Sequence, residues 1–422
     1  MRKKLGYEIG GDSCRYTERF IGRASKFAVR HRHTKPNSPI PCDYSKVDKV
    51  TICGALNPLG QYLAFLLKRQ EIIREIALYD DCNVRGLALD LEHMNTKCRV
   101  KPNSGECALK DALRHSDIIV ITNGYESNLD ESEEATRRNA QMMYKYGVKI
   151  ASICPEAFIC IITPPVNIMV PLFSEVMKVC NVYDPNKIFG VCSLMEMRAN
   201  SIVADYLNID PAAVRVPIVG GVSPTTCVPL LSHAKPYGEF SYTEMRQLIN
   251  TIFEVSDDCK KLQTNAPLST AFALSRFILT LSAGLCTCDC AIQTAFIRSN
   301  VVAQVKYFAS EIQIGIKGAV ANMGLPKVHD YELDMLSRAL VCLENDINKA
   351  YCLFNDFHRA ARADEIEDIC RPTKPFIIKT PCPPCPPCIP TEVCQPKMPE
   401  HPCASTASAK KAKDSRACSC SK

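Results

Sequence analysis

The sequence has no uninterrupted apolar stretch of bilayer length. A transmembrane helix needs about 20 consecutive apolar residues. The best candidate, Ile150–Phe173, is broken by Pro155, Pro164 and Pro165 and carries Glu156, so we predict no membrane span. The chain has 422 residues, of which 46% are hydrophobic and 23% charged. That length allows one large or two ordinary domains, with a core that needs no disulfides.

The central part of the chain lacks a basic excess. The net charge of +6 divides into +6 for residues 1–48, −6 for residues 49–370 and +6 for residues 371–422. Nucleic-acid binding by a folded domain requires a basic patch on that domain. We therefore predict no nucleic-acid partner, and we assign the basic excess to two extensions.

The N-terminal extension, residues 1–48, has few acids and a regular series of basic residues. Arg15, Arg19, Arg23, Lys26 and Arg30 would form one stripe on a helix. An Arg-rich, acid-poor amphipathic N-terminus is typical of a mitochondrial transit peptide and hence of a matrix protein. The alternative is a basic disordered arm, since acids at positions 8 and 12 are atypical of such signals.

The C-terminal extension, residues 371–422, holds 11 of the 28 prolines and 7 of the 25 cysteines, which predicts a disordered tail. A Cys-Pro-Pro repeat favours polyproline II, which would place Cys382, Cys385 and Cys388 on one face roughly 9 Å apart. This spacing is too long for a disulfide between neighbours or for a shared zinc ion. It suits cross-links to other chains in a cytoplasmic or cytoskeletal assembly; the alternative is an inert tail.

The cysteines of the central part lack the spacing of a zinc site. Cys286, Cys288 and Cys290 form C-x-C-x-C, and the others are scattered. We predict no metal site. We expect the scattered cysteines to act as small buried apolar residues in a reducing compartment. Examples are Cys53, Cys160, Cys192 and Cys227.

Short apolar runs alternate with helical stretches along the central part. The runs begin near residues 49, 76, 117 and 158. This alternation predicts a parallel, doubly wound sheet. The first run leads into the Gly-bounded turn of KVTICGALNPLGQYLAFLLK, where a dinucleotide pyrophosphate would bind. Asp80 lies 26 residues after Gly54, at the end of the second run, where a carboxylate would meet the adenosine ribose.

Several stretches together resemble the mitochondrial-type malate dehydrogenases of the lactate/malate dehydrogenase superfamily. They include IALYDDC, LALDLEHMNTK, PEAFICIITPPVN, PNKIFGVCSL, MRANSIVADYL and VRVPIVGG, nearly in register from Lys49 to about Phe354. The resemblance implies an α/β fold, with a Rossmann-type NAD-binding domain at 49–193 and an α+β catalytic domain at 194–370. It also implies NAD as cofactor, malate oxidation to oxaloacetate in the tricarboxylic acid cycle, and a homodimer.

The resemblance places the catalytic groups of the family at positions where this chain has other residues. The catalytic histidine falls on Val222 and its orienting aspartate on Met195. The substrate asparagine falls on Pro164, and one loop arginine on Ser127; a second falls near residues 131–133. Only the substrate-binding Arg198 remains, so we predict loss of dehydrogenase turnover.

The chain retains more of the family's cofactor-binding residues than of its catalytic residues. Gly54 and Gly60 stand, Asn57 replaces the middle glycine, and Asp80 is present. Asparagine tolerates the left-handed conformation, but its side chain should narrow the approach to the pyrophosphate, and the proline at 58 removes a donor. Two further positions match, Asn139 on the nicotinamide side and Thr163. NAD binding is therefore predicted to be weakened.

Two classes of function follow. The first is an inactive, malate dehydrogenase-like protein with a structural or interaction role, as a homodimer or a mixed dimer with an active paralogue. The second is an active NAD-dependent oxidoreductase that uses malate or another 2-hydroxy acid. A base relocated to Glu196, His93 or His233 would favour the second class. Acids at positions 133 and 134 would repel a dicarboxylate or, alternatively, simply begin a helix.

Overall fold

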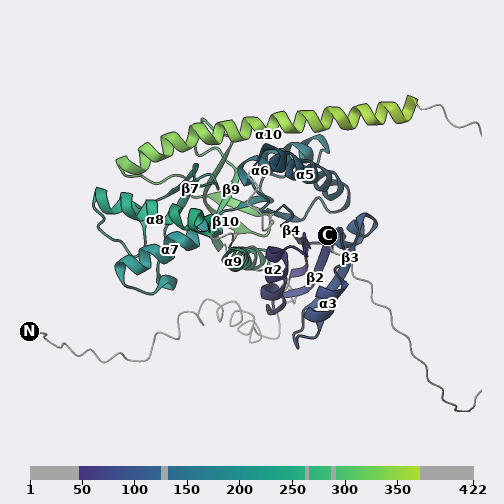
Figure 1. Ribbon diagram of the computed structural model, residues 1–422, viewed down its shortest axis with the longest axis horizontal. Coiled ribbons are helices and arrows are strands. Elements are labelled where there is room, and N and C mark those ends of the chain that lie inside the picture. Colours follow the sequence, from purple (N-terminus) through teal and green to yellow (C-terminus); the bar gives the residue numbers. More distant parts are fainter. Residues whose placement is uncertain (1–46, 125–131, 262–265, 287–290, 371–422) are drawn as a thin grey trace, which may run out of the picture. The chain divides into compact units, whose positions relative to one another are not determined.

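A computed structural model of the chain describes residues 47–124, 132–261, 266–286 and 291–370 (Figure 1). Both extensions, and with them the transit-peptide and cysteine-tail predictions, lie outside the described residues. So do Ser127 and the cysteines at 288 and 290.

Eleven strands of the described residues form one sheet, with the order β3-β2-β1-β4-β5-β6-β9-β10-β7-β8, and β11 pairs with β10. The first six strands are parallel and give the order 3-2-1-4-5-6 of a dinucleotide-binding fold. They are β1 (Val47–Cys53), β2 (Ile73–Asp80), β3 (Arg99–Ser104), β4 (Ile118–Ile121), β5 (Phe158–Ile161) and β6 (Ile188–Val191). The alternating pattern of the sequence therefore predicted the parallel sheet correctly.

The second half of the sheet is antiparallel. β9 pairs antiparallel with β6 and with β10, so the parallel and antiparallel halves form one continuous sheet. The strands of this half are β7 (Ile218–Gly220), β8 (Cys227–Pro229), β9 (Ala291–Arg298), β10 (Tyr307–Gly315) and β11 (Gly318–Asn322). The fold class predicted from the sequence, a Rossmann-type domain followed by an α+β domain, is confirmed.

Helices cover both faces of the sheet (Figure 1). One face carries the hydrophobic cluster of α5, α6 and α10. The other carries the cluster of α2, α3 and α9, and a third cluster joins α7 and α8 to β7. The α-helices are α2 (Pro58–Lys68), α3 (Arg85–Glu92), α4 (Leu109–Leu113), α5 (Glu133–Ile153), α6 (Val166–Val179), α7 (Ser193–Leu207), α8 (Tyr242–Lys261), α9 (Pro267–Cys286) and α10 (Asp330–Cys370). Short 3₁₀ turns are η2 (Glu106–Ala108), η3 (Pro211–Ala213) and η4 (Leu231–His233).

Helix α9 is long and apolar enough to span a bilayer by length and composition alone. In this fold it is a core helix: Leu274, Phe277, Ile278 and Leu281 are fully buried in the cluster that α9 shares with α2 and the sheet. Its apolar character is therefore explained by packing. The stretch that the sequence suggested as the best membrane candidate, 150–173, is instead divided among α5, β5 and α6.

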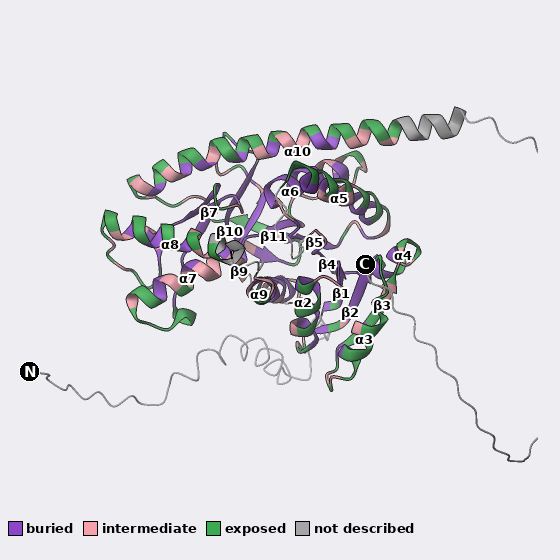
Figure 2. Cartoon of the chain, in the orientation of Figure 1, coloured by how far each residue is buried: buried purple, intermediate pink, exposed green. Residues whose placement is uncertain are grey.

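The four cysteines that the sequence analysis named are buried, as predicted, whereas Cys82, Cys107, Cys342 and Cys352 are exposed. Cys53, Cys160, Cys192 and Cys227 have at most 2% of their surface exposed and form no disulfide. Burial raises the pKa of the Cys227 thiol to about 12, so it stays protonated and acts as a small apolar group. Figure 2 shows that the central strands are buried between the helical layers, whereas the edge strands β3 and β11 are largely exposed. Among the described residues no group of three or more His, Cys, Asp or Glu side chains could hold a metal ion.

Candidate cofactor and catalytic site

The turn between β1 and α2 needs glycine at two positions because the backbone passes so close to itself. Gly54 has a φ of +89°, and a Cβ there would lie 2.7 Å from the backbone nitrogen of Asn123. A Cβ on Gly60 would lie 2.2 Å from the carbonyl oxygen of Gly54. Gly60 thus allows α2 to pack directly on the end of β1. The two glycines predicted from the sequence serve the fold whether or not a cofactor binds.

Asn57 is the N-cap of α2 and holds the turn from inside. Its Oδ1 accepts a hydrogen bond of 2.7 Å from the backbone N–H of Gly60, and its Nδ2 donates to the carbonyl oxygen of Thr122 at 2.8 Å. Its φ of −68° is ordinary extended backbone, so the left-handed conformation that we considered for this position is not used. The side chain does occupy the approach to the helix N-terminus, because it takes one of the N–H groups that would face a pyrophosphate.

Asp80 ends β2 and faces the same turn. Its Oδ2 accepts a hydrogen bond of 3.0 Å from the backbone N–H of Leu56. The acid therefore lies beside the turn, where a ribose would be expected, and its other carboxylate oxygen makes no hydrogen bond within the described residues. A dinucleotide fits this end of the turn. The pyrophosphate position fits poorly, because the N–H of Gly60 is occupied and Pro58 has no N–H to offer.

Asn139 and Thr163 tie the ends of β4 and β5 together. Asn139 Nδ2 donates to the carbonyl oxygen of Pro164 at 2.8 Å, and Thr163 Oγ1 donates to the carbonyl oxygen of Asn123 at 2.7 Å. A Cβ on Gly124 would lie 2.4 Å from Asn139 Oδ1. Both predicted residues thus lie at the carboxyl ends of the parallel strands, the edge at which ligands of such sheets bind.

Val222 follows β7 and is held by a buried amide. Its backbone N–H donates to Asn167 Oδ1 at 2.8 Å, and its side chain packs against the cluster of α5, α6 and α10. Asn167 Nδ2 in turn donates to Thr226 Oγ1 and to Asp346 Oδ2, each at 2.9 Å. Burial raises the pKa of Asp346. No local motif predicts this network, because Asp346 lies in α10, 179 residues after Asn167.

Met195 is 5% exposed and belongs to the third hydrophobic cluster. Arg198 lies one helical turn farther along α7, and its Nη1 contacts Met195 Sδ at 3.9 Å. The thioether therefore takes the contact that a carboxylate could have made with the guanidinium. A sulfur atom is a weak acceptor and carries no charge, so this pair can neither orient a base nor stabilise a proton.

The three residues considered as alternative bases, Glu196, His93 and His233, have hydrogen-bond partners or positions outside the Val222 network. Glu196 accepts a hydrogen bond of 3.3 Å from Gln293 Nε2 on β9, and burial raises its pKa while nearby Arg215 lowers it. His93 is exposed at the C-cap of α3. His233 Nδ1 lies 2.9 Å from the hydroxyl of the neighbouring Ser232. None of these hydrogen bonds joins Glu196, His93 or His233 to the Val222 network within the described residues.

The acids at the start of α5 behave as helix-start residues. Ser132 caps the helix by accepting the N–H of Ala135 at 3.1 Å, and Glu133 and Glu134 lie in the first turn. Glu133 pairs with Lys349 Nζ at 2.8 Å, which lowers the pKa of this exposed carboxyl.

Arg137 is turned toward α10 as well. Its Nη1 lies 3.7 Å from Asp356 Oδ2, and its guanidinium lies 5.5 Å from the centroid of the Phe357 ring. Tyr144 Oη also lies 3.2 Å from His358 Nδ1. The sequence did not indicate that α5 would be fastened to residues 356–358 in the second half of α10.

Comparison with known proteins agrees with this geometry. The lactate/malate dehydrogenase NAD binding domain matches residues 48–190, and the lactate/malate dehydrogenase alpha/beta C-terminal domain matches residues 192–353. Mitochondrial malate dehydrogenase of Homo sapiens is 35% identical over 305 residues, which are 71% of this chain and 90% of that protein. The Rattus norvegicus protein is 34% identical over the same shares.

Solved structures share the fold. Malate dehydrogenase from Plasmodium falciparum superposes with a TM-score of 0.62 at 21% identity, over 73% of this chain and 99% of that one. Lactate dehydrogenase from Eimeria maxima, with NADH and oxamate, gives 0.63 at 20% identity, over 74% and 96%. Two matched domains in the expected order, 35% identity to a mitochondrial malate dehydrogenase and the shared sheet have one explanation: the chain belongs to the lactate/malate dehydrogenase family.

Proposed function

We propose that this chain is a malate dehydrogenase-like pseudoenzyme that acts as a structural or interaction protein. The observation that carries the proposal is the chemistry at the two positions that the family resemblance assigns to the base and its partner. Val222 and Met195 are apolar, and both pack against hydrophobic clusters. Neither can hold or move a proton. The decisive experiment is an assay of oxaloacetate reduction by NADH, which is developed in the Discussion.

We propose in addition that NAD binds weakly, because Asn57 competes with the pyrophosphate for the N–H of Gly60. The variant Asn57→Gly should bind NADH at least about tenfold more tightly, since it frees a charge-assisted hydrogen bond of about 1.5–3 kcal/mol. Loss of the cap should cost only a few tenths of a kcal/mol in stability, because glycine is an acceptable N-cap. Isothermal calorimetry with NADH measures the change.

The matched control is Asn208→Gly, since Asn208 ends α7, outside the β1–α2 turn, and its φ of +53° is a conformation that glycine also adopts. Its affinity for NADH should equal that of the unmodified chain. Equal affinities of the unmodified chain and Asn57→Gly would contradict the proposed competition. Tight binding by the unmodified chain would contradict the proposed weakening itself.

We propose that two copies associate through the adjacent helices α2 and α9, as the family resemblance implies. Each helix buries one apolar face in the same cluster and leaves a second apolar pair exposed. Tyr62 and Phe65 of α2 are 40% and 46% exposed, and Leu268 and Phe272 of α9 are 62% and 48% exposed. Side chains of this size left in water are typical of an interface.

Phe65→Glu combined with Phe272→Glu should convert the dimer to monomer, because a buried carboxylate without a partner is costly. Sedimentation velocity measures the oligomeric state of each variant. Val341→Glu is the control, since Val341 is equally apolar and 62% exposed but lies on α10. A double variant that sediments as a dimer, or an unmodified chain that is monomeric at micromolar concentration, would contradict this interface. A mixed dimer with a paralogue would use the same face.

For the two extensions we propose the roles that the sequence suggests. Residues 1–48 direct import into mitochondria, in keeping with relatives that are mitochondrial proteins; a fluorescent fusion without these residues should lose mitochondrial localisation.

Residues 371–422 form intermolecular disulfides through their row of thiols. Non-reducing gels should then show high-mass species that disappear with reductant and in a chain ending at residue 370. Identical migration of both chains would count against cross-linking.

A further inference from the structure

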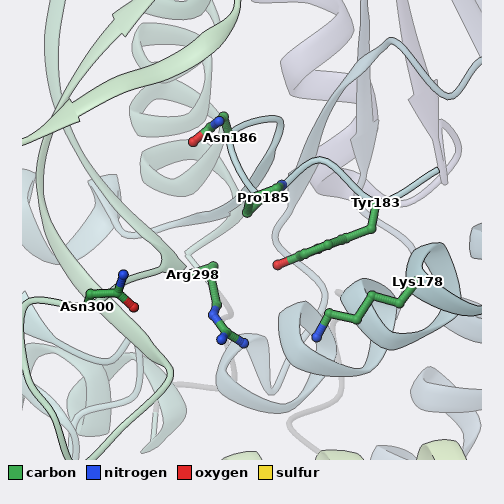
Figure 3. A pocket seen from close by; sticks show the side chains of 6 residues that line it. All are labelled: Lys178, Tyr183, Pro185, Asn186, Arg298 and Asn300. Atoms are coloured by element: carbon green, nitrogen blue, oxygen red, sulfur yellow. The ribbon is translucent and has the colours of Figure 1, made fainter. Parts of the chain in front are cut away.

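A polar pocket lies at the edge of the sheet opposite the cofactor positions. It has a volume of about 430 Å³ and is lined by Lys178, Tyr183, Pro185, Asn186, Arg298 and Asn300 (Figure 3). Lys178 is in the last turn of α6. Tyr183, Pro185 and Asn186 belong to the turn between α6 and β6. Arg298 ends β9, which runs antiparallel to β6. The pocket is therefore at the amino ends of the parallel strands, whereas Asp80 and Thr163 are at their carboxyl ends.

Arg298 is the main feature of the pocket. Its guanidinium lies 5.7 Å from the centroid of the Tyr307 ring. Within the described residues it has no ion pair and no hydrogen bond, although it is only half-exposed. Most half-buried arginines hold a carboxylate or a carbonyl oxygen, since the guanidinium carries five donors in a planar fork. An arginine packed on an aromatic ring with its donors unused is prepared to hold an anion from solution.

Other donors surround this guanidinium. In Figure 3 the Tyr183 hydroxyl extends toward the side of the pocket on which Arg298 lies. That hydroxyl is buried beside the Tyr307 hydroxyl, which is buried as well. Burial raises the pKa of Tyr183, so its hydroxyl remains a donor at neutral pH.

The charge around the pocket is positive. Lys178 Nζ lies 4.9 Å from the Tyr183 ring and pairs with Glu175 Oε1 at 2.6 Å. Lys306, at the start of β10, lies 5.6 Å from the ring of Tyr351, whose surroundings also include Arg298 and Glu175. Three cations therefore stand against one carboxylate. Glu175 can neutralise one of them, which leaves a net attraction for an anion.

An adjoining pocket indicates the size of the ligand. It has a volume of about 330 Å³ and shares Asn186, Arg298 and Asn300 with the first. Ser299 and Asn322 line its far side. Both volumes are in the range of small-molecule sites. A ligand with its anionic group on Arg298 would have amide and hydroxyl groups on both sides.

We propose that this pair of pockets binds a small organic anion through a carboxylate or phosphate group held by Arg298, with the Asn186 and Asn300 amides and the Tyr183 hydroxyl as further donors. The site is separate from the dehydrogenase cleft and does not depend on the proposed function. A chain without turnover could in this way still respond to a metabolite.

Isothermal calorimetry at low ionic strength tests the site, with inorganic phosphate in one series and succinate in the other. The unmodified chain should bind at least one of the two, and the comparison identifies which group the site prefers. Arg298→Gln should weaken that binding at least about tenfold, since a charge-assisted bidentate contact is lost. Arg338→Gln is the control, because Arg338 is an exposed arginine of α10 paired with Asp334, and it should bind as the unmodified chain does.

Circular dichroism establishes that the variants are folded. If Arg298→Gln does not fold, Asn300→Asp serves instead, because a carboxylate on the pocket wall should abolish anion binding without removing the arginine. The proposal is overturned if neither anion binds the unmodified chain at tens of millimolar. It is equally overturned if a folded Arg298→Gln or Asn300→Asp variant binds with unchanged affinity.

Discussion

Purified chain is expected to reduce oxaloacetate with NADH at least about 10⁴-fold more slowly than mitochondrial malate dehydrogenase of Homo sapiens, its 35% identical relative. Loss of a general base alone costs about 10²–10⁴ in rate. Here the position of the base is occupied by Val222, and the position of its orienting acid by Met195. The family resemblance also places the substrate asparagine at Pro164 and a loop arginine at Ser127, so the amide and the guanidinium that would position the substrate are missing.

The same assay on the double variant Val222→His with Met195→Asp provides the internal comparison. It returns an imidazole and a carboxylate but leaves Pro164 and Ser127 unchanged. We expect it to remain far below the human enzyme, because two groups that hold the substrate are still missing. Turnover by the unmodified chain within about 100-fold of the human enzyme would show that a base lies elsewhere and would refute the pseudoenzyme proposal.

Gly60→Ala is expected to destabilise the fold by about 3 kcal/mol or more. The new methyl group would lie 2.2 Å from the carbonyl oxygen of Gly54 and 2.9 Å from the Cα of Ala55. Both are backbone atoms that cannot rotate away, so α2 must move off the end of β1. Forced overpacking of this kind costs typically about 1–3 kcal/mol, and more where the backbone itself has to shift. Urea unfolding followed by circular dichroism measures the loss.

Gly86→Ala is the matched control in the same domain. Gly86 lies in the first turn of α3 and has nothing within 4 Å of the position of its added Cβ. Alanine there should stabilise the chain by roughly 0.5–1 kcal/mol, because glycine is a poor helix former. The two substitutions are chemically identical and should move the unfolding midpoint in opposite directions. If Gly60→Ala leaves the midpoint unchanged, the close approach of α2 to β1 is wrong.

The sequence was informative where function and fold require a local pattern. The alternation of apolar runs with helical stretches predicted the parallel strands, and the Gly-bounded turn with Asp80 predicted the edge of the sheet at which the cofactor positions gather. The starts of the four runs lay within about three residues of the observed strands. Such patterns survive in the sequence because strand and turn preferences act over a few neighbouring residues.

The side-chain contacts of the site could not be predicted from local sequence patterns. Asn57 was expected to narrow the pyrophosphate approach, but its role as the cap of α2 depends on the position of Gly60 and Thr122. Arg137, a cation near the substrate loop by position, is instead occupied by Asp356 and Phe357. These partners are brought together only when α10 packs along α5 (Figure 1).

By itself, the sequence determined the family and the order of the two domains, and it shows Val222 and Met195 where the resemblance places the base and its partner. Those properties depend on which residues occur and in what order. The tertiary structure alone decided that Asn57 and Asp80 each hold an N–H at the glycine turn, that Asn167 joins Val222 to Asp346, and that Arg298 packs on Tyr307 at a pocket. Hydrogen bonds and ion pairs act over a few ångströms in space, and the chain distances between these partners, from 3 residues to 179, leave no periodic trace in the sequence.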